Sequence, residues 1–161
     1  MPSSTQKIKR IFVDTNFLSS LLKSSDSLNN QALDWLEKIK IDNSKTYFYL
    51  STITIAEYCR FGDREDIPNY FQIFPFDDES AELSADFSKI IFPNKSTLNH
   101  YISLPKNIIT NDIKIIAHAE IIKPDIFLSS DQGLESIFKI LKTDSKLTYK
   151  FYNFKNPYRS F

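Results

Sequence analysis

Four acidic residues are the strongest candidates for chemistry in this sequence: Asp14, Glu57, Asp112 and Asp131. If the fold brings them together, four carboxylates repel one another strongly unless a cation lies among them. Oxygen ligands without Cys or His favour Mg²⁺ or Mn²⁺ over zinc. One or two such ions can activate a water molecule and direct it at phosphorus. The four acids therefore predict metal-dependent phosphodiester or phosphate hydrolysis.

Three of the four acids also fit a purely structural role. In "IFVDTNFLSSLL" (11–22), an apolar run breaks at Asp14 and resumes with helical spacing. Asp112 and Asp131 stand at similar junctions, where an Asp caps a helix by accepting a hydrogen bond from a free backbone N–H. Taken singly, each of these residues is better interpreted as a cap. The cation site is favoured only if the acids meet.

Glu57 is the acid for which a cap explains least. It lies about one and a half turns into the helical segment 52–62. The structural alternative is a surface ion pair with Arg60 or Arg64. Its neighbours four residues away, Ile53 and Phe61, are apolar and lie on the same helix face. This pattern predicts that Glu57 is partly buried.

The elements that must position these acids alternate along the chain. Short runs rich in β-branched and aromatic residues predict strands at 8–13, 46–50, 71–76, 125–130 and 147–152. Apolar residues spaced three and four apart predict helices at 15–23, 28–40, 52–62, 79–92, 111–123 and 132–142. The segment 92–107 carries two prolines and is interpreted as a loop or short helix.

This alternation predicts an α/β fold, a single Rossmann-like α/β/α sandwich in which about five mostly parallel strands are covered by helices on both faces. We expect one domain over residues 1–161. In such open sheets the site lies beyond the carboxyl ends of the strands, where the strand order reverses. Asp14 follows the first predicted strand and Asp131 the fourth. Both are therefore expected at that edge.

Several other kinds of site are excluded. The only glycines are Gly62 and Gly133, so neither a P-loop nor a dinucleotide-binding GxGxxG turn can form. The single cysteine, Cys59, excludes an intramolecular disulfide and a cysteine-based zinc site. No Ser stands in a GxSxG motif, and the two histidines lack the spacing of a metal pair. Any metal chemistry must use oxygen ligands.

Composition predicts a folded cytoplasmic protein. The apolar fraction of 42% and the aromatic fraction of 14% are those of a globular chain. The first residues are not followed by the apolar region of a signal peptide, and no stretch reaches the roughly 18 apolar residues of a membrane span. The net charge is zero, which argues against a protein that coats nucleic acid through a strong general field.

The charge is nevertheless distributed unevenly. Residues 63–86 hold eight acids against one Arg, which leaves minus seven, whereas residues 133–161 hold six bases against two acids, which leaves plus four. Lys139, Lys142 and Lys146 follow Asp131 at spacings that place them on one helix face. The alternative is an ordinary solvated face whose lysines complement the helix dipole. We expect these three lysines to be the candidates for substrate binding.

The sequence also resembles the PIN-domain ribonucleases, and within them the VapC-type toxins of toxin-antitoxin pairs. The resemblance extends from Ile11 to about Phe138 and depends on four segments in this order: "FVDTNFLSSLL", "STITIAEYCRFG", "NDIKIIAHAEI" and "IFLSSDQGLESI". It implies an endoribonuclease that acts on RNA, forms a homodimer and is inhibited by a small antitoxin protein. It further implies a Mg²⁺ or Mn²⁺ site with polar neighbours, formed by Asp14, Glu57, Asp112 and Asp131 with Thr15, Asn16 and Ser129.

Three other functions remain open at this stage. A housekeeping RNA-processing or DNA-acting nuclease of the same fold would have no antitoxin. A non-catalytic binding module would have lost at least one acid, and all four are present here. A phosphoacceptor receiver domain would need paired acids at the first strand, where "IFVD" offers one. The toxin nuclease is the leading hypothesis.

Overall fold

A five-stranded parallel sheet forms the centre of the structure, a computed structural model that describes residues 8–42, 45–98, 106–145 and 147–161. The strand order is β3-β2-β1-β4-β5, and every neighbouring pair is parallel. The strands are β1 (Ile8–Val13), β2 (Lys45–Ser51), β3 (Phe71–Phe74), β4 (Ile126–Ser129) and β5 (Lys150–Asn153). The predicted α/β fold with about five mostly parallel strands is confirmed.

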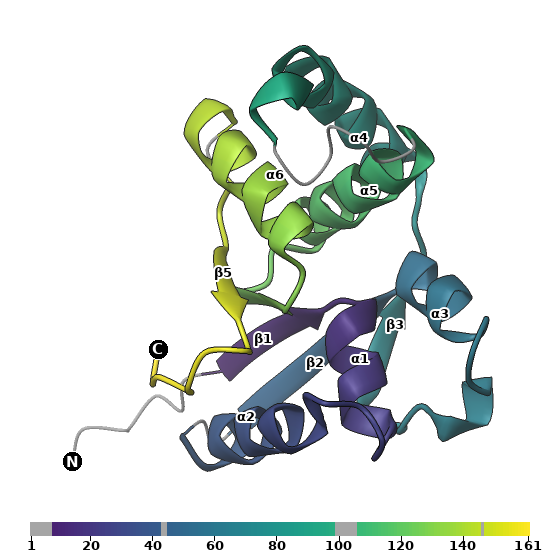
Figure 1. The fold of residues 1–161 in the computed structure, drawn as a ribbon, viewed down its shortest axis with the longest axis vertical. Helices are drawn as coiled ribbons and strands as arrows, with labels where there is room; N and C mark the ends of the chain where they lie inside the picture. Colours follow the sequence, from purple (N-terminus) through teal and green to yellow (C-terminus); the bar gives the residue numbers. More distant parts are fainter. Residues whose placement is uncertain (1–7, 43–44, 99–105, 146) are drawn as a thin grey trace.

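Helices cover both faces of this sheet (Figure 1). They are α1 (Thr15–Leu22), α2 (Asn29–Asp42), α3 (Thr52–Tyr58), α4 (Asp78–Ile91), α5 (Lys106–Ile122) and α6 (Gln132–Asp144), with short 3₁₀ helices at Arg64–Asp66 and Phe92–Thr97. Helices α4, α5 and α6 pack together on one face, and α1 and α2 lie against the other, with α3 beside α1. No helix within the described ranges has both the length and the apolar character needed to cross a bilayer.

Alternation along β1 divides the core into two layers. Phe12 packs in the layer beneath α4, α5 and α6, whereas Ile11 and Val13 pack in the layer beneath α1 and α2. This is the period of two expected for a strand that is buried on both faces. The last apolar residue of β1 is followed at once by Asp14, which is only 4% exposed. The core therefore extends up to the candidate carboxylate.

The strand order creates a switch point at the carboxyl end of β1. From β1 the chain proceeds through β2 and β3 on one side, whereas β4 and β5 lie on the other. The connections therefore diverge beyond the ends of β1 and β4, which opens a crevice there. Asp14 directly follows β1, and Asp131 lies two residues beyond β4. The sheet topology brings these two acids to the same crevice.

Helix α5 begins earlier than the sequence pattern predicted. Its first residue is Lys106 rather than residue 111, because the helical spacing of apolar residues continues toward the amino end of the segment. Ile109, in this additional part of the helix, is fully buried. Asp112 therefore lies inside the helix and not at its first turn, so its interpretation as an N-cap was wrong. The remainder of the predicted loop 92–107 contains the 3₁₀ helix Phe92–Thr97, and residues 99–105 lie outside the described ranges.

Two other element boundaries differ from the prediction by three or more residues. Helix α3 ends at Tyr58 rather than at residue 62, and the chain then turns, with the backbone N–H groups of Phe61 and Gly62 donating to the Tyr58 carbonyl oxygen. A Cβ atom at Gly62 would lie 2.6 Å from that ring, so only glycine fits this turn without displacing Tyr58. Strand β5 pairs with β4 only from Lys150 onward, whereas the prediction started it at residue 147.

Candidate active site

Asp14 is the buried centre of the site. It is the N-cap of α1: its Oδ1 accepts a hydrogen bond from the Phe17 backbone N–H at 3.1 Å. Its other oxygen, Oδ2, accepts from the Ser129 hydroxyl at 2.5 Å. The capping interpretation of Asp14 is therefore correct in its geometry, but capping uses only one of the two oxygens. The second oxygen is held by Ser129, the last residue of β4.

Burial also changes the acidity of Asp14. The pKa of its carboxyl group is raised from 3.8 to about 7, chiefly because burial removes its hydration. Hydrogen bonds from Ser129 and Phe17 lower this pKa, and the negative charges of Asp131 and Glu57 contribute smaller increases. Asp131 and Glu57 thus lie close enough to Asp14 for their charges to affect its pKa. A carboxylate with so little water around it and two negative neighbours gains strongly from a cation.

Asp131 is held in the same hydrogen-bond network. It caps α6 by accepting from the Leu134 backbone N–H at 2.9 Å, and its own backbone N–H donates to the Ser129 hydroxyl at 3.0 Å. Its Oδ2 lies 3.5 Å from the Asn16 side-chain amide. Ser129 therefore connects Asp131 to Asp14, and Asn16 connects α1 to the start of α6.

Glu57 is connected to the site through Thr15. The Thr15 hydroxyl donates to Glu57 Oε2 at 2.5 Å, which joins α3 to the first residue of α1. Glu57 is half-buried, as its apolar neighbours predicted. Among the described residues no ion pair involves Glu57, so the alternative of a surface pair with Arg60 or Arg64 was wrong. Glu57 also lies in the last turn of α3 rather than in mid-helix.

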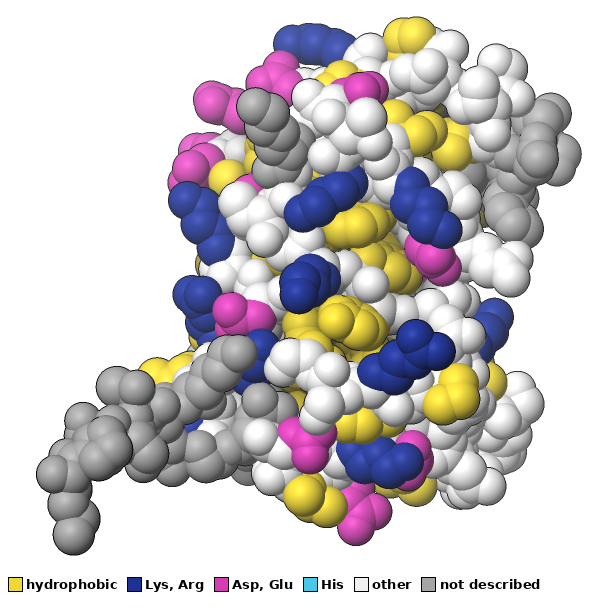
Figure 2. Space-filling view, turned by 90° about the vertical axis from the view of Figure 1, so that its left-hand side faces the viewer, with side chains coloured by type: hydrophobic (Ala, Val, Ile, Leu, Met, Phe, Trp, Pro, Cys, Tyr) yellow, Lys and Arg dark blue, Asp and Glu magenta, His cyan; other side chains and the backbone are white. Residues whose placement is uncertain are grey.

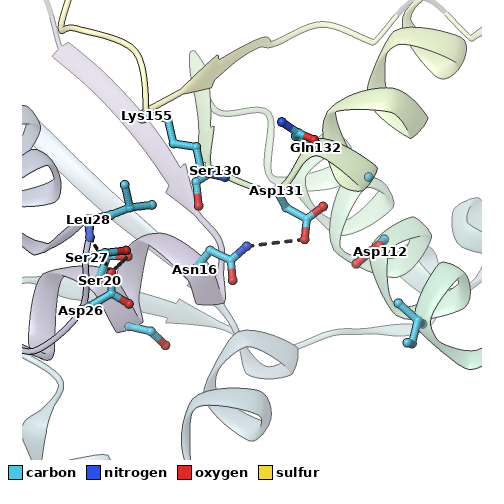
Figure 3. Close-up of a pocket in the computed structure, with 13 residues that line it drawn as sticks. Asn16, Ser20, Asp26, Ser27, Leu28, Asp112, Ser130, Asp131, Gln132 and Lys155 are labelled. Atoms are coloured by element: carbon cyan, nitrogen blue, oxygen red, sulfur yellow. Dashed lines mark hydrogen bonds between the residues drawn. The ribbon is translucent and has the colours of Figure 1, made fainter. Parts of the chain in front are cut away.

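Asp112 and Asp131 line one cavity of about 630 Å³, which we call the acidic cavity. Its wall includes Asn16, Asp26, Asp112, Ser130, Asp131 and Lys155. Figure 3 shows Asn16 and Asp131 directed toward each other, with Asp112 on α5 at the far side of the cavity. The structure thus brings Asp112 to the cavity that Asp131 lines, although Asp112 lies within a helix rather than at its end. Asp14 and Glu57 are not among the residues that line this cavity.

The acids do not form a ready-made coordination shell. Within the described residues, no three acidic, histidine or cysteine side chains converge closely enough to hold an ion directly. Mg²⁺ commonly binds through one or two carboxylates and keeps several of its waters. The donor set therefore fits a hydrated divalent ion better than a fully protein-coordinated one.

Two of the three lysines predicted to bind substrate, Lys139 and Lys142, lie away from this cavity. Lys139 forms an ion pair with Glu135 at 2.8 Å and lines a separate hollow beside the 3₁₀ helix Phe92–Thr97. The Lys142 ammonium donates to the backbone carbonyl oxygens of Leu147 and Tyr149. Along α6 it is roughly 16 Å from Asp131. Lys146 lies outside the described residues. A substrate role for these lysines stays a prediction.

Replacing Lys142 by Met distinguishes a structural role of this side chain from a role in substrate binding. Met keeps the helix propensity and the length of the stem but cannot donate to the Leu147 and Tyr149 carbonyl oxygens. We expect the free energy of unfolding to fall by about 1 kcal/mol, with RNA affinity unchanged. Urea unfolding and RNA titration of the same preparation measure both quantities. A loss of affinity without a loss of stability would return Lys142 to substrate binding.

Several residues of the acidic cavity were not candidates in the sequence. Lys155 lies just after β5, Gln132 begins α6, and Asp26 belongs to the connection between α1 and α2. The rule that located Asp14 and Asp131, a position beyond the carboxyl end of a parallel strand, also applies to Lys155. That signal was available in the sequence, but it was applied to acids alone. Asp26 gave no comparable signal.

The family comparison covers most of the chain. The PIN domain family model matches residues 11–140. This range includes Asp14, Glu57, Asp112 and Asp131, and it ends within α6. The chain has no significant match among curated protein sequences.

Similar folds occur in solved structures of low sequence identity. VapC20 of Mycobacterium tuberculosis, a toxin that cleaves the sarcin-ricin loop, is 15% identical, with a TM-score of 0.54 over 78% of this chain and 93% of that chain. VapBC2 of Rickettsia felis, bound to a DNA fragment from its promoter, is 13% identical, with a TM-score of 0.54 over 89% and 98%. DNA-bound VapBC of Salmonella typhimurium is also 13% identical, with a TM-score of 0.53 over 91% and 98%. At these identities the likeness concerns the fold.

Proposed function

Because the chain belongs to the PIN domain family, we propose that it is a metal-dependent endoribonuclease and the toxin of a toxin-antitoxin pair. One observation supports the nuclease most strongly. A buried carboxylate, Asp14, experiences the negative charge of both Asp131 and Glu57 at the switch point of a parallel sheet. Such an arrangement destabilises the protein when no cation is bound, and it favours the binding of a cation.

Mg²⁺ or Mn²⁺ is the proposed cofactor, and four acids are proposed to hold it directly or through water: Asp14, Glu57, Asp112 and Asp131. Their oxygens are hard ligands that suit these ions. When bound, a divalent ion supplies a nucleophilic water and stabilises charge on the phosphate and the leaving oxygen. Asp14 gains most from that positive charge, because burial has removed its water and raised its pKa to about 7.

The neighbouring polar residues position these carboxylates. The Ser129 hydroxyl holds one oxygen of Asp14, and the Thr15 hydroxyl holds one oxygen of Glu57. Asn16 directs its side-chain amide toward Asp131. Asp14, Glu57 and Asp131 therefore enter the site with at least one oxygen fixed by a hydrogen bond and their orientation restricted. This preorganisation reduces the cost of aligning the groups around a substrate phosphate.

The toxin assignment is supported by the similarity to toxin structures. VapC20 is a toxin that cleaves the sarcin-ricin loop, and the two VapBC structures contain complexes bound to DNA. We propose by analogy that this chain cleaves RNA in the cytoplasm, forms a homodimer and binds a small antitoxin protein. A gene for a small protein directly beside this one is expected for a toxin and absent for a housekeeping nuclease.

Sequencing of RNA ends tests the proposal most directly. Purified protein is incubated with total cellular RNA in Mg²⁺ or Mn²⁺, and new 5′ ends are mapped. We expect discrete cuts that disappear when EDTA replaces the metal ion. Cleavage that persists in EDTA would exclude the metal-dependent mechanism. An RNA population without new ends under both metal conditions would exclude the nuclease itself.

A further inference from the structure

We propose that Lys155 binds a phosphate group of the RNA substrate at the wall of the acidic cavity, an assignment that rests on the proposed nuclease function. It is the only Lys or Arg among the described residues that line this cavity. The acids on the same wall are Asp26, Asp112 and Asp131, so a polyanion that enters meets mostly negative charge. A cation beside these acids would offset the repulsion.

The backbone around Lys155 is fixed by contacts on both sides. Phe154, the preceding residue, is fully buried, donates its backbone N–H to the Ser129 carbonyl oxygen at 3.1 Å and packs edge-on against Phe17. The Lys155 backbone N–H donates to the Asn153 side-chain oxygen at 3.0 Å. Its carbonyl oxygen accepts from the Gln31 side-chain amide.

Ser129, the residue that orients Asp14, also positions the backbone next to Lys155. Ser129 holds the Asp14 carboxylate with its hydroxyl and the Phe154 backbone with its carbonyl oxygen. Figure 3 shows Lys155 on the side of the cavity where Ser130 and Asp131 lie. The start of the Lys155 side chain is therefore fixed relative to the carboxylates, whereas its exposed ammonium group can adjust to a ligand. That combination suits a point charge that meets a flexible phosphate.

The other basic residues on this side of the molecule are less suitable. Figure 2, which views the molecule from the side of β5 and the chain ends, shows Lys and Arg side chains spread among hydrophobic and uncharged ones rather than gathered in one patch. Lys139 and Lys142 already have intramolecular partners. No ion pair between described residues involves Lys155, so its charge remains available to a ligand.

The expected role of Lys155 is substrate binding rather than chemistry. A lysine at the cavity wall can bind a phosphate next to the one that is cleaved. The carboxylates then act only at the phosphate that is cleaved. Loss of such a contact weakens binding for all RNA sequences, because phosphates carry no sequence information. It should raise KM and leave kcat almost unchanged, since the contact exists before and during the reaction.

Binding measurements in a cleavage-deficient background test the assignment. Asp14→Asn protein is titrated with a short fluorescent single-stranded RNA of mixed sequence at several salt concentrations, with and without the additional change Lys155→Gln. We expect Lys155→Gln to weaken binding about fivefold and to flatten the slope of log affinity against log salt by about 0.7, the value for one phosphate contact on a single strand. Lys155→Arg should retain the parent slope.

A matched control comes from the same strand. Lys150 lies at the opposite end of β5 and is also exposed, so Lys150→Gln removes the same charge away from the acidic cavity. Its affinity and salt slope should equal those of the parent. An equal salt slope for Lys155→Gln and the parent would overturn the Lys155 assignment and leave the nuclease proposal intact. A parent that binds no RNA, together with no cleavage by the unmodified protein, would overturn both.

Discussion

Replacing Asp14 by Asn is expected to lower the rate of RNA cleavage by at least about a hundredfold while the fold is retained. Asn keeps a side-chain oxygen that can accept from the Phe17 N–H, and Asn is as good an N-cap as Asp. The change removes only the negative charge and one acceptor oxygen. Initial rates at saturating Mg²⁺ on a mapped RNA target measure the effect, and circular dichroism confirms the fold.

Asp77 provides the matched control for this experiment. It caps α4 in the same manner, with Oδ1 accepting from the Ser80 N–H at 2.9 Å, but it is exposed, and hydrogen bonds from Ser80 lower the pKa of its carboxyl group, which neither Asp131 nor Glu57 influences. Asp77→Asn should therefore retain full cleavage activity. If Asp14→Asn also retained it, Asp14 would be a helix cap and nothing more.

The same substitution should stabilise the protein when no metal is present. The pKa of Asp14 is about 7 in the folded chain and ordinarily 3.8, so the folded state holds a proton that the unfolded state releases. Stability must then fall as pH rises from about 4 to about 7, by at most about 4 kcal/mol. Asn avoids this loss. In EDTA we expect Asp14→Asn to melt above the unmodified protein at pH 8 and level with it near pH 4. A lower melting temperature at pH 8 would contradict the burial argument.

The sequence could predict the sheet because its signals are local. Strand β1 begins in a charged stretch of the sequence and ends just before Asp14. Its predicted bounds agree with the structure. Patterns that depend on tertiary contacts were less informative. The carboxyl end of α3 coincides with the turn in which Gly62 approaches the Tyr58 ring, and the start of β5 is set by its pairing with Ile126. Neither contact leaves a periodic signal in the chain.

The position of the candidate site could be predicted from the sequence, but the contacts that bring its residues together could not. The rule that sites lie beyond the carboxyl ends of parallel strands located Asp14 and Asp131. The same rule could not show that Ser129 joins these two acids, because that needs the distance between side chains on neighbouring strands. It also could not show that Asp112 reaches the cavity from inside α5.

Glu57 provides the second large effect. Glu57→Gln should weaken the affinity for Mn²⁺ by at least about tenfold, because the change removes one of the negative charges that surround Asp14. The hydrogen bond with Thr15 is kept, since a Gln side-chain oxygen can accept from the same hydroxyl. The melting temperature in EDTA should therefore hold or rise. Calorimetric titration with Mn²⁺ measures affinity on the same preparation.

Two roles for Glu57 predict different results in this titration. As a residue that only joins α3 to α1, it acts through the Thr15 hydrogen bond, so Gln would leave both metal affinity and cleavage unchanged. As a metal ligand, or as a group that holds a metal-bound water, it acts through its charge, and Gln must lower both. Glu37→Gln, on the exposed side of α2, controls for a general loss of negative charge and should leave the affinity unaltered. Equal Mn²⁺ affinity for Glu57→Gln and the unmodified protein would restrict the metal site to Asp14, Asp112 and Asp131.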